Sequence, residues 1–410
     1  MPLSLVFKLF EEFFEAFLLL VELTPTFLWL VVFVIHWIYT LQVWSSLNPV
    51  KPLSKFLAFP LDGNLHIVVP CKGVQECTLA CIRSIIQCEK RPGTRLYFCV
   101  EDKNDPVVKL IEGENQKVHI TGGQSDALNP KMRNVIPVVR LITCNHDYIM
   151  LMDSNMLCPR NYVRDYCNAM ISRQLMAASV YAVGDLQEDT FASRLEQAML
   201  VTFFGKGAVY GECIHLSPLI GKCMTIRKGT LDIVGGLEAI KDFVSEDGVL
   251  GLLVAKSTHT VGLLLGHEAP QYLKGGTPES VLARCERWFA IRRYHVPLVF
   301  WIELMFYPLI TGVFIHYFLC NTGMAWITVG LIPFALVLAT DTYFLKAISE
   351  KVGTKGVKWD YLTAFFYVLC VQLFLPVVWY RVAFKDAGSS FNWLNTVYHI
   401  DGKTAKYKKL

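Results

Sequence analysis

The sequence predicts an α/β domain built on a mostly parallel β-sheet and joined to membrane-spanning helices on both sides. Two observations predict this fold class. Between residues 62 and 290, short apolar runs bounded by turn residues alternate with helical apolar patterns, which is typical of βαβ units. Long apolar segments with few charges lie before and after that region, at 25–47 and at 296–380.

The composition excludes several classes of protein. Of the 410 residues, 53% are hydrophobic and only 18% are charged, against roughly 25% charged in soluble domains, so membrane segments account for part of the chain. The net charge of +4 and the lack of a basic patch interleaved with aromatic residues exclude nucleic acid as a partner. The 13 cysteines, an odd number scattered through apolar sequence, indicate free thiols in a reducing compartment.

The N-terminal part contains two membrane-associated segments. Charged residues interrupt the apolar pattern of residues 1–24 too often for a spanning helix, which predicts an amphipathic surface helix. Residues 25–47 are nearly uncharged and provide the roughly 20 residues that a helix needs to cross a bilayer. Lys51 and Lys55 follow this segment and indicate that its downstream side is cytosolic.

Residues 62–290 are predicted to form the soluble domain. Their apolar runs suit strands that are buried on both faces of a parallel sheet. The predicted strands are Leu65–Pro70, Leu96–Val100, Lys117–Thr121 and Tyr148–Asp153, and the predicted helices are 75–88 and 131–143.

Two of the predicted strands end in acidic residues, at Glu101-Asp102 and at Asp153. Ligands of open α/β sheets bind outside the carboxyl ends of the strands, so these carboxylates are expected at a binding site. Asp153 offers hard oxygen ligands to a divalent cation that holds a diphosphate. The alternative is that each acid only caps the turn after its strand.

The C-terminal part is predicted to return to the membrane. Three segments are each long enough to cross a bilayer, namely Leu298–Cys320, Gly323–Leu345 and Tyr361–Trp379, and a tail at 381–410 follows. The last five residues, 406–410, match a KxKxx retrieval pattern, which acts only on a cytosolic tail. One span before the domain and three after it put the tail opposite a cytosolic domain, so the two predictions disagree.

Four polar motifs follow one another along the chain: Val100-Glu101-Asp102, Asp153-Ser154-Asn155, Ser245-Glu246-Asp247-Gly248 and Arg284-Cys285-Glu286-Arg287-Trp288. Their order, between membrane spans, resembles that of the membrane-bound GT-A glycosyltransferases. Over roughly residues 25–400 the chain is similar to the ceramide glucosyltransferases. The further matches to that family are Pro70-Cys-Lys-Gly-Val74, Cys99-Val-Glu-Asp-Lys-Asn-Asp-Pro106, Gly122-Gly123, Asn129-Pro130-Lys131 with Asn134, Leu195-Glu196-Gln197, and Arg227-Lys228 with Gly235-Gly236.

The resemblance implies a GT-A-type domain that transfers glucose from UDP-glucose to the primary hydroxyl of ceramide, with inversion at the anomeric carbon. It also implies a divalent cation, Mg²⁺ or Mn²⁺, as cofactor. By the same resemblance, Asp102 holds the uridine, Asp153 and Asn155 hold the metal ion, Asp247 is the catalytic base, Arg284, Arg287 and Trp288 line the donor–acceptor site, and Lys72, Lys131 and Glu246 contact substrate. A carboxylate base suits this reaction because an alcohol is a poor nucleophile at neutral pH.

Departures from the family pattern leave alternatives open. Asn155 replaces the second carboxylate of a full Asp-x-Asp triplet, and the segment from Phe391 to Tyr398 lacks the arginine of the family's WRG motif. The enzymatic alternatives are another lipid acceptor or UDP-galactose as donor. A catalytically silent membrane scaffold of the same fold is the alternative from another class. In each case the domain is expected to face the cytosol on Golgi or ER membranes.

Overall fold

The computed structural model describes residues 63–213, 219–258, 260–303, 332–352, 357–393 and 396–409. The predicted amphipathic segment at 1–24 and the predicted span at 25–47 lie outside the described residues. So do most of the predicted span at 298–320 and the first part of the one at 323–345.

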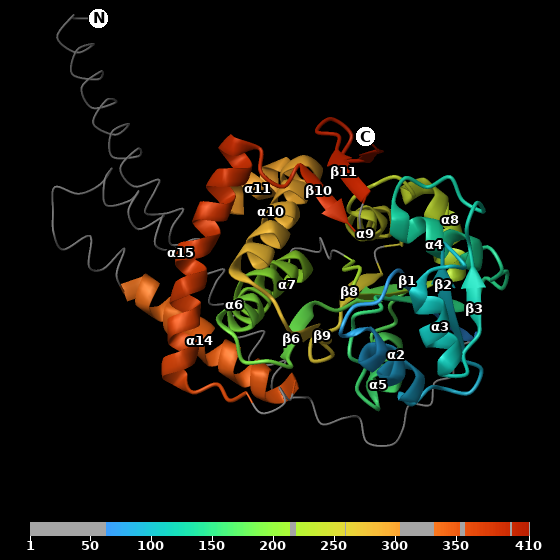
Figure 1. Cartoon of the computed structure of the whole chain (residues 1–410), viewed down its shortest axis with the longest axis horizontal. Helices are drawn as coiled ribbons and strands as arrows, with labels where there is room; N and C mark the ends of the chain where they lie inside the picture. Colours follow the sequence, from blue (N-terminus) through green and yellow to red (C-terminus); the bar gives the residue numbers. More distant parts are fainter. Residues whose placement is uncertain are drawn as a thin grey trace, which may run out of the picture.

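A seven-stranded sheet forms the centre of the α/β domain, with the strand order β3-β2-β1-β4-β7-β5-β8 (Figure 1). Its strands are β1 (Leu65–Cys71), β2 (Arg95–Val100), β3 (Val118–Ile120), β4 (Tyr148–Met152), β5 (Ala177–Ser179), β7 (Cys223–Arg227) and β8 (Val261–Leu263). Neighbouring strands are parallel except where β7 pairs with β4 and β5. The predicted fold class, a mostly parallel α/β sheet, is confirmed, and the four predicted strands correspond to β1–β4.

Helices cover both faces of this sheet, as in the alternating layers of Figure 1. One face packs on α2 (Thr78–Gln87), α3 (Pro106–Gly113) and α5 (Tyr162–Ser172), and the other on α4 (Pro130–Val139), α8 (Lys228–Ile233), η2 (Leu237–Ile240) and α9 (Glu246–Thr258). Along β1, Ile67 and Val69 join the first core, whereas Val68 joins the second. Because successive side chains of a strand point to opposite faces, a continuous apolar run is buried on both.

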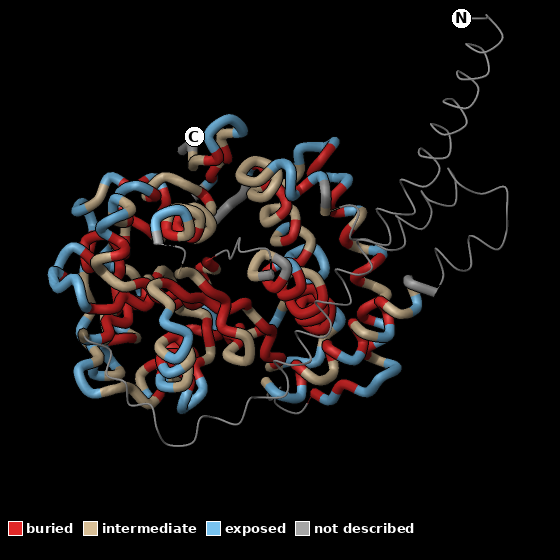
Figure 2. Tube along the Cα trace, turned by 180° about the vertical axis from the view of Figure 1, so that it is seen from behind, coloured by how far each residue is buried: buried red, intermediate tan, exposed pale blue. Residues whose placement is uncertain are grey.

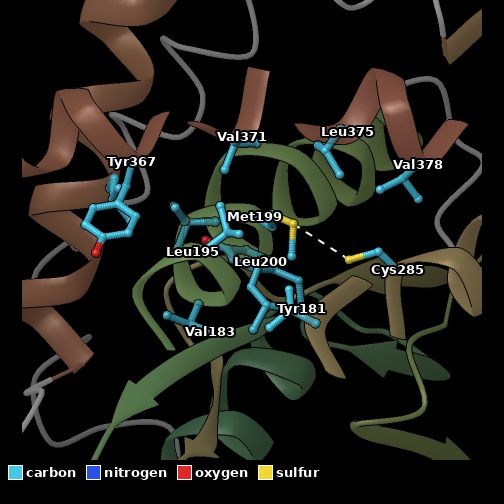
Figure 3. Packing of buried hydrophobic residues seen from close by; sticks show 14 of the residues in the cluster. Tyr181, Val183, Leu195, Met199, Leu200, Cys285, Tyr367, Val371, Leu375 and Val378 are labelled. Atoms are coloured by element: carbon cyan, nitrogen blue, oxygen red, sulfur yellow. Dashed lines mark hydrogen bonds between the residues drawn. The ribbon is translucent and has the colours of Figure 1, made fainter. Parts of the chain in front are cut away.

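A second layer, mostly helical, stands beside the sheet (Figure 1). It consists of α6 (Phe191–Met199), the π-helical turn η1 (Leu200–Gly205), α7 (Lys206–Cys213), α10 (Pro278–His295), α11 (Pro297–Ile302), α14 (Ile332–Val352), α15 (Tyr361–Lys385) and the strand pair β6 (Ala182–Leu186) and β9 (Ala269–Leu273). Figure 3 shows Val371 and Leu375 of α15 pointing toward Leu195 and Met199 of α6. In Figure 2, runs of buried residues, coloured red, are present both in the sheet and in this second layer.

Helix α15 is the one described helix that is long and apolar enough to cross a membrane. Near its start, Trp359 Nε1 donates to Gln197 Oε1 of α6 at 2.9 Å, and near its end Arg293 of α10 donates to the Val382 carbonyl at 2.6 Å. Its other side exposes apolar residues, among them Leu362 at 79% and Phe384 at 61%. One face of α15 therefore packs on the domain, and the other is an apolar face exposed on the protein surface.

The C-terminal residues form a small antiparallel sheet of β10 (Ser390–Trp393), β11 (Thr396–Ile400) and β12 (Tyr407–Lys409). Main-chain hydrogen bonds attach it to the α/β domain, because Val244 N donates to Ala405 O at 3.2 Å and Tyr407 N donates to Asp242 O at 2.9 Å. Tyr398 Oη accepts from Arg133 at 3.2 Å. Strands β11 and β12 are therefore part of the α/β domain and lie on its side of any membrane.

This attachment predicts the result of a topology experiment. A tag placed after Leu410 should be digested in sealed vesicles under the same conditions as an epitope inserted at the exposed Gly123, because both belong to one folded unit. Protease protection followed by immunoblotting measures this. A protected tag beside a digested epitope would contradict the predicted placement of the tail.

Candidate active site

The carboxyl ends of β1, β2 and β4 lie at one edge of the sheet, because these strands are parallel. Strand β7 runs antiparallel to β4, with Met152 opposite Cys223, so the start of β7 lies at the same edge. There, Asp153 N donates to the Lys222 carbonyl at 3.0 Å. The pairing of two strands therefore fixes Asp153 and Lys222 side by side.

The Asp153 carboxylate pairs with two ammonium groups. Lys131 Nζ lies 3.0 Å from its Oδ1, and Lys222 Nζ lies 3.2 Å from its Oδ2. Burial by itself raises the pKa of Asp153, but the charges of Lys131 and Lys222 outweigh it and hold this pKa below the ordinary value. Asp153 is consequently ionised at neutral pH.

Lys131 connects Asp153 to the Glu246-Asp247 pair. It occupies the first turn of α4, where the Asn129 side chain accepts from Lys131 N at 2.9 Å and caps the helix. Its Nζ lies 3.3 Å from Glu246 Oε1 and donates to the Gly221 carbonyl at 2.8 Å. Burial favours a lower pKa, but the surrounding carboxylates raise the pKa of Lys131 above its ordinary value, so the ammonium remains charged.

Asp247 stands in the first turn of α9, and three donors fix its carboxylate. Gly221 N donates to Oδ2 at 2.6 Å, while Ser245 Oγ and Gly248 N donate to Oδ1 at 3.1 and 2.8 Å. A Cβ at position 221 would lie 2.9 Å from Lys131 Nζ and 3.0 Å from Asp247 Oδ2. This close approach explains why glycine occupies position 221. Among the described residues, the three donors leave the Asp247 carboxylate one free acceptor site of about four.

Glu246 is buried, and its Oε2 accepts from Asn129 Nδ2 at 3.0 Å. Burial and, to a smaller extent, the neighbouring Asp247 charge raise the pKa of Glu246 to about 7, although Lys131 opposes this. Glu246 therefore changes its charge near neutral pH, one residue away from the predicted base.

Asp153 and Asn155, the predicted metal ligands, do not fit a divalent cation as they are arranged. Each carboxylate oxygen of Asp153 already pairs with an ammonium, and Asn155 Oδ1 accepts from Lys222 Nζ at 2.8 Å. Among the described residues, no cluster of three or more His, Cys, Asp or Glu side chains could hold a metal ion. The divalent cation stays a prediction for this chain.

Two of the predicted site residues on α10, Arg284 and Arg287, have different partners. Arg284 forms an ion pair with the buried Glu196 of α6, which also accepts from Gln271 at 3.3 Å. Arg287 is half-buried, and burial lowers its pKa. Burial and the Glu246 charge raise the pKa of the half-buried Tyr407, and the Arg287 charge opposes this, so Glu246 and Arg287 both lie near that phenol.

An aromatic cluster holds this part of α10 against η1. Trp288 packs edge-to-face on Phe204, with ring centroids 4.7 Å apart. The guanidinium of Arg292 lies 4.8 Å from the Phe204 ring centroid. A π-helical turn such as η1 widens one turn of the helix and is frequent at functional sites.

The acid at the end of β2 lies at the same edge but outside the Lys131 cluster. Strand β1 separates β2 from β4, which puts the ends of those two strands roughly 10 Å apart. Asp102 is exposed and accepts from Asn104 N at 2.8 Å. It is Asp105 that orders the loop after β1, since both of its oxygens accept from Gly73 N, next to Lys72.

The sequence prediction missed several residues of this site, namely Gly221, Lys222, His295 and Tyr407. A Gly-Lys pair immediately before the apolar run Cys223–Arg227 was the available signal for the first two. His295 Nε2 is buried without a hydrogen-bond partner among the described residues, and it would lie 3.5 Å from a Cβ at Gly248. Burial lowers the pKa of His295, and the nearby Asp247 opposes this.

Comparison with known proteins identifies relatives of the chain. A family model described as "Glycosyl transferase family 21" matches residues 25–406. Ceramide glucosyltransferase 3 of Caenorhabditis elegans is 23% identical over 313 residues, which cover 74% of this chain and 66% of that protein. Ceramide glucosyltransferase 1 of the same organism is 22% identical over 217 residues, 51% of this chain and 45% of that protein. The chain thus matches less than two thirds of the length of these relatives.

Two solved structures are similar at low scores. The mannosyltransferase PcManGT from Pyrobaculum calidifontis, in complex with GDP-Man and Mn²⁺, has a TM-score of 0.43 and 10% identity, covering 88% of this chain and 99% of its own. Glucosyl-3-phosphoglycerate synthase from Mycobacterium tuberculosis, with Mn²⁺ and UDP-glucose, has a TM-score of 0.37 and 11% identity, covering 56% and 77%.

The raised pKa of Glu246 predicts a pH-dependent stability. A carboxyl group whose pKa is higher in the folded than in the unfolded state stabilises the fold below its unfolded pKa and loses that contribution as pH rises through about 7. Between pH 6 and 8 the loss is about 1 kcal/mol. Glu246→Gln should therefore flatten the change in thermal midpoint over this range, measured by fluorescence in detergent. An unchanged slope, equal to that of the exposed control Glu238→Gln, would refute the assignment.

Proposed function

The chain belongs to glycosyl transferase family 21, and from this premise we propose that it transfers glucose from UDP-glucose to the primary hydroxyl of ceramide, with inversion. The names of the two curated relatives support ceramide as acceptor and glucose as the transferred sugar. The observation that carries the proposal is one polar cluster at the ligand-binding edge of the sheet. In it, the Lys131 ammonium pairs with Asp153 on one side and adjoins Glu246 and Asp247 on the other.

Asp247 is the proposed base. The ceramide oxygen attacks the anomeric carbon, its proton passes to the free acceptor site of Asp247, and the bond from that carbon to the diphosphate breaks with its electron pair leaving on UDP. The hydrogen bonds from Gly221, Ser245 and Gly248 orient the carboxylate before the substrate arrives. This preorganisation is what a general base requires, and one displacement needs no covalent intermediate.

Cationic side chains at the same edge support the departure of UDP. Lys131 stays charged because of its carboxylate neighbours, and Arg287 approaches from α10. Positive charge fixed in a partly buried site stabilises the negative charge that develops on the diphosphate. Asp102 and Lys72, which follow β2 and β1, are proposed to contact the uridine end of the donor, and Trp288 is proposed to line the acceptor side.

A membrane location follows from the same proposal, because ceramide resides in lipid. Helix α11 begins two residues after α10 ends, and it exposes Leu298 at 72%, Val299 at 46% and Trp301 at 48%. Such a patch suits the apolar boundary of a bilayer. The eleven cysteines whose side chains the structure describes are all free, which agrees with a domain facing the reducing cytosol of Golgi or ER membranes.

The substrate proposal is tested with purified full-length protein, each of several UDP-sugars and a panel of lipids, with products identified by mass spectrometry. Glucosylceramide from UDP-glucose is the expected product. Transfer to diacylglycerol or a sterol, or from UDP-galactose, would reassign the substrate within the same reaction class. Absence of both transfer and UDP-sugar hydrolysis would favour a silent scaffold of the same fold.

Replacing the base tests the mechanism. Asp247→Asn should reduce kcat by about 10²–10⁴-fold, the usual contribution of a general base, because the amide accepts no proton. UDP binding, measured by calorimetry, should remain close to that of the parent protein, as should the circular dichroism spectrum. Asp232→Asn, on the exposed Asp232 of α8, is the matched control. Near-normal turnover of Asp247→Asn would remove Asp247 as the base.

A further inference from the structure

The start of β7 brings a second lysine against the end of β4. Lys222 Nζ donates to Asn155 Oδ1 at 2.8 Å and lies 3.2 Å from Asp153 Oδ2. These two side chains are the ones that the sequence predicts as metal ligands. An ammonium group therefore occupies the position expected for the divalent cation.

The main chain holds Lys222 in this position. Its carbonyl accepts from Asp153 N at 3.0 Å, and the next residue, Cys223, is paired with Met152 of β4. The Lys222 side chain is only 13% exposed, against 29% for Asp153. Lys222 thus differs from a surface lysine, whose side chain samples many rotamers and whose ion pairs contribute little.

The ammonium and a divalent cation exclude each other at this place. Mg²⁺ requires oxygen ligands at roughly 2.0–2.1 Å in octahedral geometry, and the oxygens nearest to such an ion already contact Lys222. The other oxygen of Asp153 contacts Lys131 at 3.0 Å. A divalent cation bound by Asp153 Oδ2 and Asn155 Oδ1 would have to displace the Lys222 ammonium from both oxygens.

We propose that Lys222 takes over the role of the divalent cation, its ammonium binding the diphosphate of the sugar nucleotide and stabilising the charge on the departing UDP. This inference rests on the proposed function for its donor, a nucleoside diphosphate sugar. Lysine is a compact, strongly charged donor that binds phosphate well. When the bond from the anomeric carbon to the β-phosphate oxygen breaks, that oxygen keeps the electron pair and Lys222 stays protonated.

The first test uses the unaltered protein. Glucosyl transfer is measured by mass spectrometry and UDP binding by calorimetry, each after extensive EDTA treatment and again with added Mn²⁺ or Mg²⁺. Both quantities should be unchanged within error in all conditions. If EDTA abolishes transfer and UDP binding and Mn²⁺ restores them, the inference is overturned.

The second test alters the lysine. Lys222→Ala should weaken UDP binding about tenfold, the cost of losing one charged hydrogen bond, and should lower kcat about 100-fold. Lys222→Arg should retain more of both because it keeps the charge. Lys256→Ala, at an exposed lysine of α9, should behave like the parent protein. UDP binding by Lys222→Ala at parental affinity would refute the role.

These experiments separate the inference from the proposed function. If no lipid receives glucose, yet UDP binding is insensitive to EDTA and depends on Lys222, the proposed acceptor fails and the inference stands. If ceramide is glucosylated only in the presence of metal, the proposed function stands and the inference fails. The EDTA comparison needs no variant, so misfolding of Lys222→Ala cannot decide the outcome.

Discussion

The antiparallel pairing of β7 with β4 is the constraint on which the candidate site depends. It aligns the Gly221-Lys222 dipeptide with the end of β4, where the Lys222 carbonyl accepts from Asp153 N. The Gly221 carbonyl accepts a hydrogen bond from Lys131, and the Gly221 N–H donates one to Asp247. The Lys222 side chain forms an ion pair with Asp153. One short stretch of main chain thus connects the predicted base to the predicted diphosphate site.

The sequence predicts those parts of the site that depend on residues close together in the chain. Continuous apolar runs predict β1–β4, since strands buried on both faces lack polar alternation, and the acids at the ends of β2 and β4 indicate the ligand edge. Strand β7 is also largely buried, but no local pattern predicts that a strand runs antiparallel inside an otherwise parallel sheet. Its direction decides that Lys222 lies at the ligand edge, and so this residue was missed.

Motif spacing predicted neighbours on one element better than partners across elements. Arg284, Arg287 and Trp288 are spaced to share one face of α10, but Arg284 pairs with Glu196 and Arg287 lies near Tyr407. Those partners come from α6 and from the C-terminal strands, far away in the sequence. The half-buried Tyr407 belongs to a segment whose composition predicts only a tail. Its position depends on main-chain hydrogen bonds to residues 242–244, which no local pattern predicts.

In the proposed reaction, helix α10 connects the proposed base to the proposed lipid acceptor. Near its end, His295 adjoins the Asp247-Gly248 turn, and the chain then enters α11, whose exposed Leu298 and Trp301 suit a bilayer boundary. Only a few residues separate the polar cluster from that apolar surface, and the exposed face of α15 continues the apolar surface alongside. In the proposed reaction, the lipid acceptor would therefore raise only its headgroup toward Asp247 and keep its chains in hydrocarbon. The cost of extracting those chains, about 0.8 kcal/mol for each methylene, is then largely avoided.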